Sequence, residues 1–238
     1  MYTPFGNPRF RRIRPGIETL PCSFSLPRHR HLRAYATVVL RGTFEESGYV
    51  GRIRASYGDV LIHPTLDCHA NRMVSAGVKL IRLDWDDTDG IVGLYHLEDV
   101  DEIARTAETD IRQTTHLLKR ALRNSPAPSP GQKHDWPDLL LADLSKDLST
   151  EIRLWAESNG LARETVSRGF AAAYGIAPSV LRAELRTRTA WLRITRGADC
   201  LSRIAADTGF ADQSHMTRWV HRMTGATPAA WRQCSSPL

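Results

Sequence analysis

Arginine gives this sequence its clearest chemical signal, because it is concentrated towards one end of the chain. Residues 161–238 contain eleven arginines and five acidic residues, but no lysine. A guanidinium group donates paired hydrogen bonds to a phosphate or to the edge of guanine, whereas a surface selected only for solubility normally includes lysine. The pattern therefore favours a polyanionic partner such as nucleic acid. An arginine-biased genome would explain the missing lysines equally well.

The cysteines and the apolar residues argue against several other classes of protein. Cys22, Cys68, Cys200 and Cys234 are far apart and form no CxxC pair, so neither a disulfide framework nor a thiolate zinc site is expected. No run approaches the roughly 20 apolar residues of a membrane helix, and the N-terminal sequence has no apolar segment typical of a signal peptide. We therefore expect a cytoplasmic protein with no membrane partner.

An internal repeat in the C-terminal part shows how the arginines are positioned. Two pairs match at an offset of 49 (Ala156 with Ala205, Gly160 with Gly209), and four at an offset of 50 (Val166 with Met216, Arg168 with Arg218, Phe170 with Val220, residues 175–178 with 225–228). Each copy predicts a short helix with a small alanine, a glycine that can adopt positive φ, and a second helix with apolar residues at i and i+4.

This arrangement is typical of a helix-turn-helix, in which the second helix presents polar residues on its far face. The short helices are expected at Ile152–Ser158 and Leu201–Thr208. Ser179–Thr195 predicts a long helix between the copies, which would hold two recognition helices about 34 Å apart, in successive major grooves. Purely structural helix pairs also end in glycine, but two copies with arginine at the same position weaken that alternative.

Two segments carry a family resemblance, GLARETVSRGFAAAYGIAPSVLRAELR at 160–186 and CLSRIAADTGFADQSHMTRWVHRMTGATPAAWR at 200–232. They resemble the DNA-binding domain of the AraC/XylS family of transcription regulators over Asp138 to Gln233. The resemblance implies seven helices, with two helix-turn-helix units joined by the long middle helix. Trp155, Trp219 and Val220 depart from the family pattern, but all are apolar residues at core positions and affect packing detail.

The resemblance also implies which residues read DNA. In the first unit Glu164, Ser167 and Arg168 would face bases, with Arg163 and Thr165 near phosphate. In the second unit the base-facing residues would be Gln213, Ser214, His215 and Arg218. Arginine can pair with guanine, glutamine with adenine, and glutamate can accept from cytosine. Each residue taken alone could instead be a solvated surface group.

The N-terminal half predicts a different class of structure. From Tyr35 to about Leu83, short β-rich runs such as ATVVL and VKLIRL alternate with glycine turns, which indicates a sandwich or small barrel. The HRH sequence at 29–31, the segment GDVLIHP at 58–64 and His69 resemble the cupin-like sensor domain that commonly precedes this DNA-binding domain. We therefore expect an α+β chain with an N-terminal cupin-like β-barrel and a C-terminal all-α domain.

The cupin resemblance implies that His29, His31 and His69 bind a divalent metal such as zinc. Residues two apart on a strand point to one face, and three imidazoles with a water would suffice for zinc. The cupin glutamate expected shortly after the pair is absent, and Tyr35 or Ala36 takes its place. Histidines lining a dry or organic-ligand pocket are the alternative, and His63 is expected to be structural.

The two halves are expected to be joined by a helix and a linker. Apolar residues recur at spacings of four and three between 98 and 123, a stripe that would pack on its own domain or pair with a second copy; residues 108–110 could divide this helix. We predict a sensing domain at 1–97, a dimerisation or connecting segment at 98–123, a proline-rich linker at 124–137 and a DNA-binding domain at 138–238.

The predicted function is that of a sequence-specific regulator of transcription that responds to a small molecule or metal. Its partners would be double-stranded DNA, the effector, RNA polymerase and a second copy of the chain, and it would not be an enzyme. A DNA-tethered cupin metalloprotein or enzyme is the alternative, against which the missing glutamate argues. A sequence-indifferent architectural binder is disfavoured because a glutamate such as Glu164 repels phosphate unless it reads a base.

Overall fold

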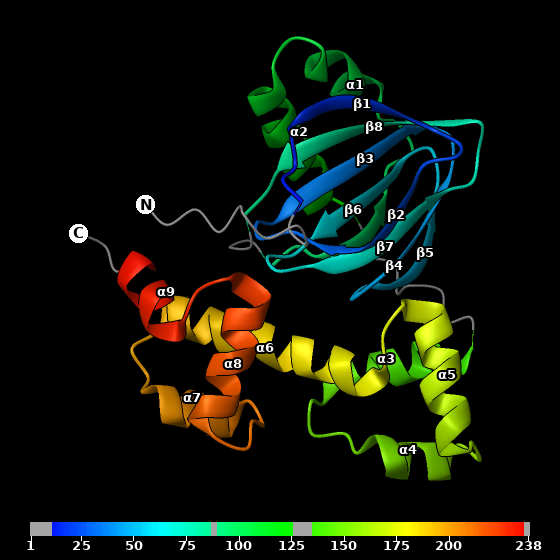
Figure 1. The fold of residues 1–238 in the computed structure, drawn as a ribbon. Coiled ribbons are helices and arrows are strands. Elements are labelled where there is room, and N and C mark those ends of the chain that lie inside the picture. Colours follow the sequence, from blue (N-terminus) through cyan, green and yellow to red (C-terminus); the bar gives the residue numbers. More distant parts are fainter. Residues whose placement is uncertain (1–10, 87–89, 126–134, 236–238) are drawn as a thin grey trace. The chain divides into compact units, whose positions relative to one another are not determined.

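The computed structural model of the 238-residue chain describes residues 11–86, 90–125 and 135–235. The chain divides into two compact units, one rich in strands and one helical, which separate between Asp138 and Leu139 (Figure 1). Most of the predicted linker at 124–137 lies outside the described residues. Within the described ranges, no helix has both the length and the apolar character that a membrane span requires.

The N-terminal unit consists of two antiparallel sheets. Its strands are β1 (Gly16–Pro21), β2 (Ser25–Arg30), β3 (Tyr35–Arg41), β4 (Phe44–Gly48), β5 (Gly51–Ala55), β6 (Asp59–His63), β7 (Cys68–Met73), β8 (Gly77–Asp84) and β9 (Gly93–His96). One sheet has the order β1-β8-β3-β6-β9 and the other the order β2-β7-β4-β5. The pairing of β1-β8-β3-β6 with β2-β7-β4-β5 is that of a jelly roll, the architecture that includes the cupins. The predicted β-rich N-terminal domain is confirmed.

The larger sheet is apolar on both faces, because successive strand residues point to opposite sides. Val39 and Leu80 lie in a core that also contains Phe44 of the smaller sheet, so this core fills the space between the sheets. Their neighbours Val38 and Ile81 lie in a second core on the outer face. This double burial explains why the strand sequences are runs of apolar residues rather than an alternation.

Two short helices cover the outer face of the larger sheet. They are α1 (Asp101–Ala107) and α2 (Ile111–Arg123), so the predicted single helix is divided, as residues 108–110 allowed. The side chain of Asp110 accepts hydrogen bonds from the backbone amides of Arg112 and Gln113 and so begins the second helix. Leu118 and Leu122 are buried in the outer core. The apolar stripe therefore packs on its own domain, which is the first of the two predicted alternatives.

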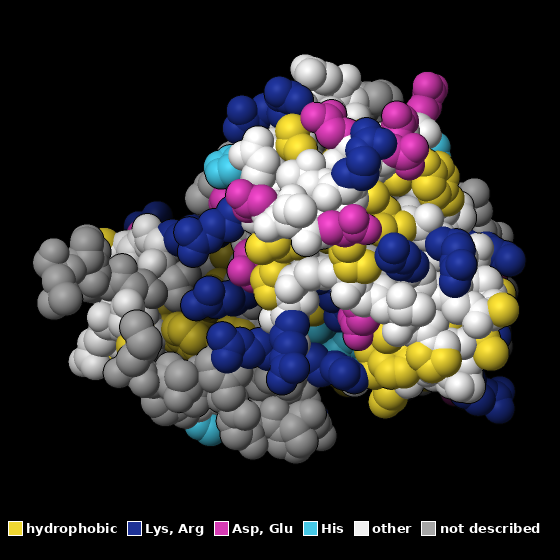
Figure 2. Space-filling model, turned by 90° about the horizontal axis from the view of Figure 1, so that it is seen from above, with side chains coloured by type: hydrophobic (Ala, Val, Ile, Leu, Met, Phe, Trp, Pro, Cys, Tyr) yellow, Lys and Arg dark blue, Asp and Glu magenta, His cyan; other side chains and the backbone are white. Residues whose placement is uncertain are grey.

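The helices α1 and α2 carry both acidic and basic residues. Asp101 and Glu102 begin α1, whereas Arg120 and Arg123 lie in the last turn of α2, which packs beside α1. On the face shown in Figure 2, Asp and Glu side chains lie among Lys and Arg side chains. This mixture is typical of a solvated surface.

The C-terminal unit consists of seven described helices, as predicted. They are α3 (Trp136–Lys146), α4 (Ile152–Ser158), α5 (Arg163–Tyr174), α6 (Pro178–Arg196), α7 (Leu201–Asp207), α8 (Gln213–Thr224) and α9 (Pro228–Ser235). The long helix α6 begins with Pro178, whose fixed φ suits the first helical position, and ends at Gly197. Ala190 and Ile194 of α6 pack in one core with Ile204 of α7 and with Met216 and Val220 of α8.

Candidate nucleic-acid interface and candidate metal site

The two copies of the sequence repeat fold in the same way. The turn glycines Gly160 and Gly209 have φ of 66° and 75°, a conformation that glycine adopts at little cost. After each glycine the chain makes the same hydrogen bond back to the first helix, from Leu161 N to Ala156 O at 2.9 Å and from Phe210 N to Ala205 O at 3.0 Å. The predicted helix-turn-helix units therefore lie at α4–α5 and α7–α8.

The second helix of each unit has one buried and one exposed side. Val166 and Phe170 of α5, like Met216 and Val220 of α8, are at most 1% exposed. The polar residues predicted to read DNA lie on the other side. Eight of those nine side chains are exposed, namely Arg163, Glu164, Thr165, Ser167, Arg168, Gln213, Ser214 and Arg218. Arg168 and Arg218 thus occupy equivalent exposed places in the two units.

His215, the ninth predicted residue, is built into the second unit. Its ring is half-buried and lies edge-on to Phe210, with ring centroids 5.4 Å apart. Its Nε2 accepts a hydrogen bond from Trp219 Nε1 at 3.0 Å. With one nitrogen committed to the indole, this imidazole has less freedom to contact a base than its neighbours Gln213 and Ser214.

The two second helices also begin differently. The carboxylate of Asp212 accepts from the backbone amide of His215 at 2.6 Å and so caps α8. The residue before α5 is Ala162, which makes no side-chain cap. The first-turn amides of α5 remain available to an anion, whereas one of those of α8 is already satisfied.

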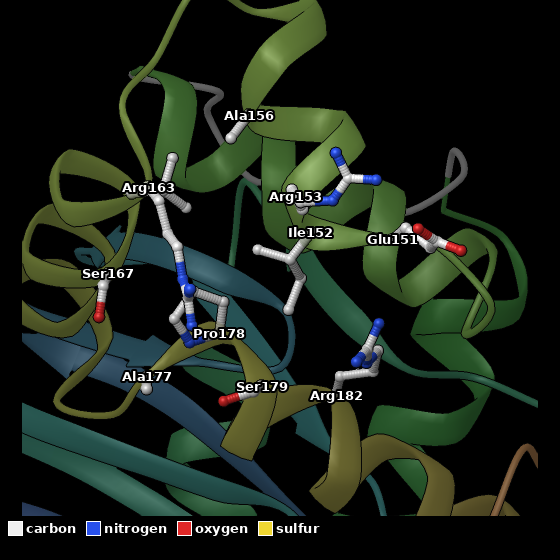
Figure 3. Close-up of a pocket in the computed structure, with 11 residues that line it drawn as sticks. Glu151, Ile152, Arg153, Ala156, Arg163, Ser167, Ala177, Pro178, Ser179 and Arg182 are labelled. Atoms are coloured by element: carbon white, nitrogen blue, oxygen red, sulfur yellow. The ribbon is translucent and has the colours of Figure 1, made fainter.

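A cleft of about 530 Å³ adjoins the first unit. It is lined by α4, α5 and the start of α6, which contribute the guanidinium groups of Arg153, Arg163 and Arg182 and the carboxylate of Glu151 (Figure 3). Ser167, one of the predicted reading residues, also lies on its wall. The concave surface beside α5 is therefore predominantly basic.

Some of the arginine excess has a structural role. Arg186 donates from Nη2 to Leu148 O at 2.7 Å and from Nη1 to Gly209 O at 2.7 Å. Arg193 forms ion pairs with Asp199 at 2.6 Å and Asp207 at 2.9 Å. These contacts tie α6 to the loop before α4 and to the second turn, a use of arginine that the composition did not reveal.

A second site lies in the N-terminal unit, where the pairing of strands gathers four histidines. His29 of β2 is paired with His69 of β7, and Tyr35 of β3 is paired with His63 of β6. His31 follows directly after β2, and the ring centroids of His29, His31 and His69 are 4.6 to 5.1 Å apart. All four histidines are buried, and one ring nitrogen each from His29, His31 and His69 lies within 4.8 Å of the others. The structure thus brings together the three predicted ligands.

The hydrogen bonds of these rings leave one nitrogen of each directed at the cluster. The Nδ1 atoms of His29 and His31 lie 3.0 and 2.9 Å from the carbonyl oxygens of Pro27 and Arg11, and Nδ1 of His69 lies 2.6 Å from Asp67 Oδ2. Next to such acceptors Nδ1 must carry the proton, so in the neutral form of each ring the lone pair is on Nε2. His31 Nε2 is buried without a hydrogen-bond partner among the described residues. This is the arrangement that metal-binding histidines adopt.

Burial keeps two of these rings neutral. Desolvation, together with the nearby His69, lowers the pKa of His29 to about 4 and that of His31 to about 2. For His69, burial lowers the pKa, but the carboxylates of Glu46 and Asp67 outweigh burial and raise it. The site therefore contains two neutral imidazoles, those of His29 and His31, next to two buried carboxylates, and these residues fit a divalent cation.

Sequence reasoning missed two members of this site, Glu46 and Asp67. Glu46 of β4 is 5% exposed, with Oε2 at 3.9 Å from His69 Nε2. Asp67 accepts from both His63 and His69, and the Tyr35 hydroxyl lies 3.2 Å from His69 Nε2. No spacing along the chain indicates that Glu46 belongs to the site. The structure shows it, because Glu46 is a buried residue of β4, a strand whose residues alternate between buried and half-buried. His63, expected to be structural, contacts Asp67 at the back of the cluster.

Comparison with protein families finds a match in the C-terminal unit. The family model described as "Helix-turn-helix domain" matches residues 155–233, from within α4 to within α9. No curated protein matches the sequence.

Similar solved structures include ToxT from Vibrio cholerae O395, at 9% identity over 94% of this chain and 98% of that chain with a TM-score of 0.42. The DNA-binding domain of AdpA in complex with a target DNA is 22% identical over 42% of this chain and 92% of that one, with a TM-score of 0.39. A probable AraC family transcriptional regulator from Rhodopseudomonas palustris CGA009 is 17% identical over 41% and 94%, with a TM-score of 0.39. Of these three, the first extends over nearly the whole chain and the other two over less than half of it.

Proposed function

We propose that this chain, whose residues 155–233 are a helix-turn-helix domain of the AraC type, is a sequence-specific DNA-binding regulator of transcription. The N-terminal unit would be its sensor. One observation carries the proposal: two helix-turn-helix units with the same turn hydrogen bonds expose polar faces on α5 and α8, with an arginine at the equivalent place in each.

Each exposed face suits the edge of a base pair. Arg168 and Arg218 would donate two hydrogen bonds to guanine, and Gln213 would pair with adenine. Glu164 would accept from cytosine, a role that makes sense of an acidic residue on a face directed at phosphates. Because its ring is held by Trp219, His215 would position α8 rather than read a base.

Phosphate contacts would fix the register of the first unit. Arg163 and Thr165 lie in the first turn of α5, whose backbone amides have no side-chain cap. Arg182 lines the same cleft from α6. Guanidinium groups and free amides at a helix start bind phosphate oxygens, and such contacts position a protein without specifying sequence.

The sensor would bind a divalent metal through Nε2 of His29, His31 and His69. A bound ion would supply positive charge that holds three imidazoles and nearby carboxylates in one arrangement. Among the described residues the cavity beside these histidines has a volume of about 20 Å³, enough for about one water molecule. Such limited space favours metal binding over turnover of an organic substrate, and so a regulator over a metalloenzyme.

A homodimer and a contact with RNA polymerase complete the proposal. The apolar stripe on α1 and α2 is used within its own domain, so a second copy would pair through other surfaces. Ligand binding would act by favouring one arrangement of the DNA-reading units over another.

Selection of binding sites from random duplexes tests the DNA-reading function. The full chain should recover a bipartite motif with its two halves about one helical turn apart. Arg218→Ala should weaken binding to that motif by about 1–3 kcal/mol and relax the preference at one base pair. Arg105→Ala, which removes the same charge from an exposed position on α1, serves as the control and should leave the preference unchanged.

Two results would contradict the proposal. Recovery of no motif, with affinity that depends on salt alone, would indicate a sequence-indifferent binder. An unchanged motif and affinity in both Arg168→Ala and Arg218→Ala would mean that α5 and α8 are not the reading helices.

A further inference from the structure

We propose that the cleft beside α5 binds a small organic phosphate, a phosphate monoester with an apolar body, and that this ligand excludes DNA from the first helix-turn-helix unit. The binding site does not depend on the DNA-reading function proposed above, whereas the exclusion rests on it. The cleft would give the helical unit an effector of its own, distinct from the metal proposed for the strand-rich unit.

The cleft has the size and the walls of a ligand pocket. Its volume of about 530 Å³ lies within the range of about 300–1,000 Å³ that is common for small-molecule pockets. Part of its wall is apolar, with side chains from α4, α5 and the start of α6, namely Ile152, Ala156, Val166, Ala177 and Pro178. A phosphate of the DNA backbone would leave this apolar surface uncovered, whereas the apolar body of a small ligand would bury it.

The charged groups of the cleft match a dianion. Three arginines and one acidic residue, Glu151, line it and leave two positive charges. A phosphate monoester carries a charge of about −1.5 to −2 at pH 7, and a guanidinium group can pair with two of its oxygens. In Figure 3 Arg163 extends from the start of α5 toward Pro178, and Arg182 extends from α6 toward α4. A phosphate between these helices would therefore be within reach of both side chains.

The second copy of the repeat shows which of these arginines the fold uses. Arg182 donates from Nη1 to Thr150 O at 2.7 Å, just before α4. Its counterpart at an offset of 50, Arg232, donates from Nη2 to Asp199 O, also at 2.7 Å and just before α7. The contact occurs in both copies, so Arg182 has a structural role in addition to its place in the cleft.

The other two arginines occur in the first copy alone. At the positions that match Arg153 and Arg163 the second copy has Ser202 and Gln213, so a helix-turn-helix unit folds without arginine at either place. Arg153 forms an exposed ion pair with Glu157 at 2.8 Å, which contributes little to stability. Arg163 makes no side-chain hydrogen bond or ion pair with another described residue. Both guanidinium groups are therefore available to an anion.

A ligand in the cleft would occupy groups that the first unit needs for DNA. Arg163 is proposed to contact a backbone phosphate, and Ser167, which is proposed to read a base, lies on the wall of the cleft. The first-turn amides of α5, which have no side-chain cap, would also bind the ligand phosphate. DNA and the ligand would therefore compete for α5. The start of α8 is capped by Asp212 and lies outside this competition.

Isothermal titration calorimetry of the full chain with phenyl phosphate tests the site, with inorganic phosphate and phenol as separate probes of its two parts. Phenyl phosphate should bind one equivalent at least about tenfold more tightly than either part, because charge and apolar surface both contribute. The double variant Arg153→Ser with Arg163→Gln, which places the residue types of the second copy in the cleft, should weaken binding at least about tenfold. Arg203→Ser is the matched control, because Arg203 forms the same i,i+4 pair on α7, with Asp207 at 3.8 Å.

The duplex recovered by selection from random sequences tests the exclusion. At a phenyl phosphate concentration ten times its own Kd, the wild type should bind this duplex about tenfold more weakly. The ionic strength is kept constant, because DNA affinity depends on salt. In the double variant, phenyl phosphate at the same concentration should leave the remaining DNA affinity unchanged.

The outcomes separate the ligand site from the DNA-reading function. Failure of phenyl phosphate to bind, or equal binding in the double variant, would overturn the site even if the chain recovers a DNA motif. Equal affinities for phenyl phosphate and inorganic phosphate would overturn the assignment to an organic phosphate. Recovery of no motif, with phenyl phosphate bound through the two arginines, would overturn the DNA-reading function and the exclusion but would support the site.

Two further results decide the remaining cases. Binding of phenyl phosphate and duplex together, without effect on each other, would overturn the exclusion. If the double variant does not fold, Arg163→Gln alone decides: it should still weaken the binding of phenyl phosphate, and an unchanged titration would overturn the site.

Discussion

The two candidate sites differ in how the chain assembles them. The DNA-reading faces are each made by one helix, and residues a few positions apart in the sequence lie side by side on it. The histidine cluster draws on β2, β3, β4, β6 and β7, so its members meet only after both sheets have formed. One site is exposed and local, and the other is buried and non-local. Binding residues can thus be found from the sequence when one element carries them, but not when sheet topology gathers them.

The two sites also differ in how they bear on stability. The exposed arginines on α5 and α8 can change with little effect on folding, because surface substitutions are usually worth less than about 0.5 kcal/mol. The cluster buries four histidines and two carboxylates, whose desolvation must be offset by hydrogen bonds. Substitutions there affect both folding and binding.

The largest expected effect tests whether the two units depend on separate cores. Phe170 is 0% exposed and stacks on Tyr174 with ring centroids 4.7 Å apart. Phe170→Ala should lower the unfolding free energy of the helical unit by about 3–5 kcal/mol through the lost packing and the cavity. Metal binding by the N-terminal unit should persist. Urea unfolding followed by far-UV circular dichroism, beside Co²⁺ titration, measures both.

Leu154→Ala is the control for this substitution, because Leu154 lies on α4 and is 47% exposed. Its unfolding free energy should stay within about 0.5 kcal/mol of the wild type. Loss of metal binding in Phe170→Ala would show that the two units fold as one and would remove the contrast between the sites.

The repeat explains how much of the helical site could be predicted. Ala156, Ala205, Val166 and Met216 are buried as their spacing indicated, and both turn glycines have positive φ. What the repeat could not predict is where the copies diverge. The cap from Asp212 and the bond between His215 and Trp219 depend on residues that occur in one copy alone.

In the strand-rich unit the prediction extended to the fold class but only to part of the site. His29 and His31 have the HxH spacing that places two side chains on one face of a strand. His69 was added through the cupin resemblance. Glu46 reaches the cluster through its pairing with Asn71, a contact between residues 25 positions apart. Register between strands is set by core packing and turn geometry and not by any local motif. For this reason Glu46 and Asp67 escaped notice.

A smaller effect should distinguish the two turns of the repeat. Both glycines have positive φ, so alanine costs roughly 1–2 kcal/mol at either place. A Cβ on Gly160 would meet no atom within 4 Å, whereas one on Gly209 would lie 3.0 Å from the guanidinium of Arg186. Arg186 also donates hydrogen bonds to Leu148 O and Gly209 O. Gly209→Ala should therefore lower the unfolding free energy by about 1 kcal/mol more than Gly160→Ala does, which is the net contribution of one hydrogen bond.

Urea unfolding of the two variants measures this difference in stability. Equal losses would show that Arg186 moves aside without cost. A greater loss for Gly160→Ala would contradict the structural role assigned to Arg186.

The smallest effect concerns the hydrogen bond that holds His69 when no metal is bound. Burial raises the pKa of Tyr35 well above its ordinary value, so its hydroxyl keeps its proton and, when the His69 ring is neutral, donates to His69 Nε2. A metal must displace that donor, since both use the same lone pair. Tyr35→Phe should therefore tighten Co²⁺ binding by about 2- to 10-fold, the equivalent of a net hydrogen bond of about 0.5–1.5 kcal/mol.

Tyr57→Phe, at a residue that is 46% exposed, is the control and should titrate as the wild type does. Weaker binding in Tyr35→Phe would mean that the tyrosine oxygen supports the loaded site instead of competing with it. In that case the hydroxyl would belong among the groups that support the loaded site, and the buried site would depend on still more of the sheet than the histidines alone indicate.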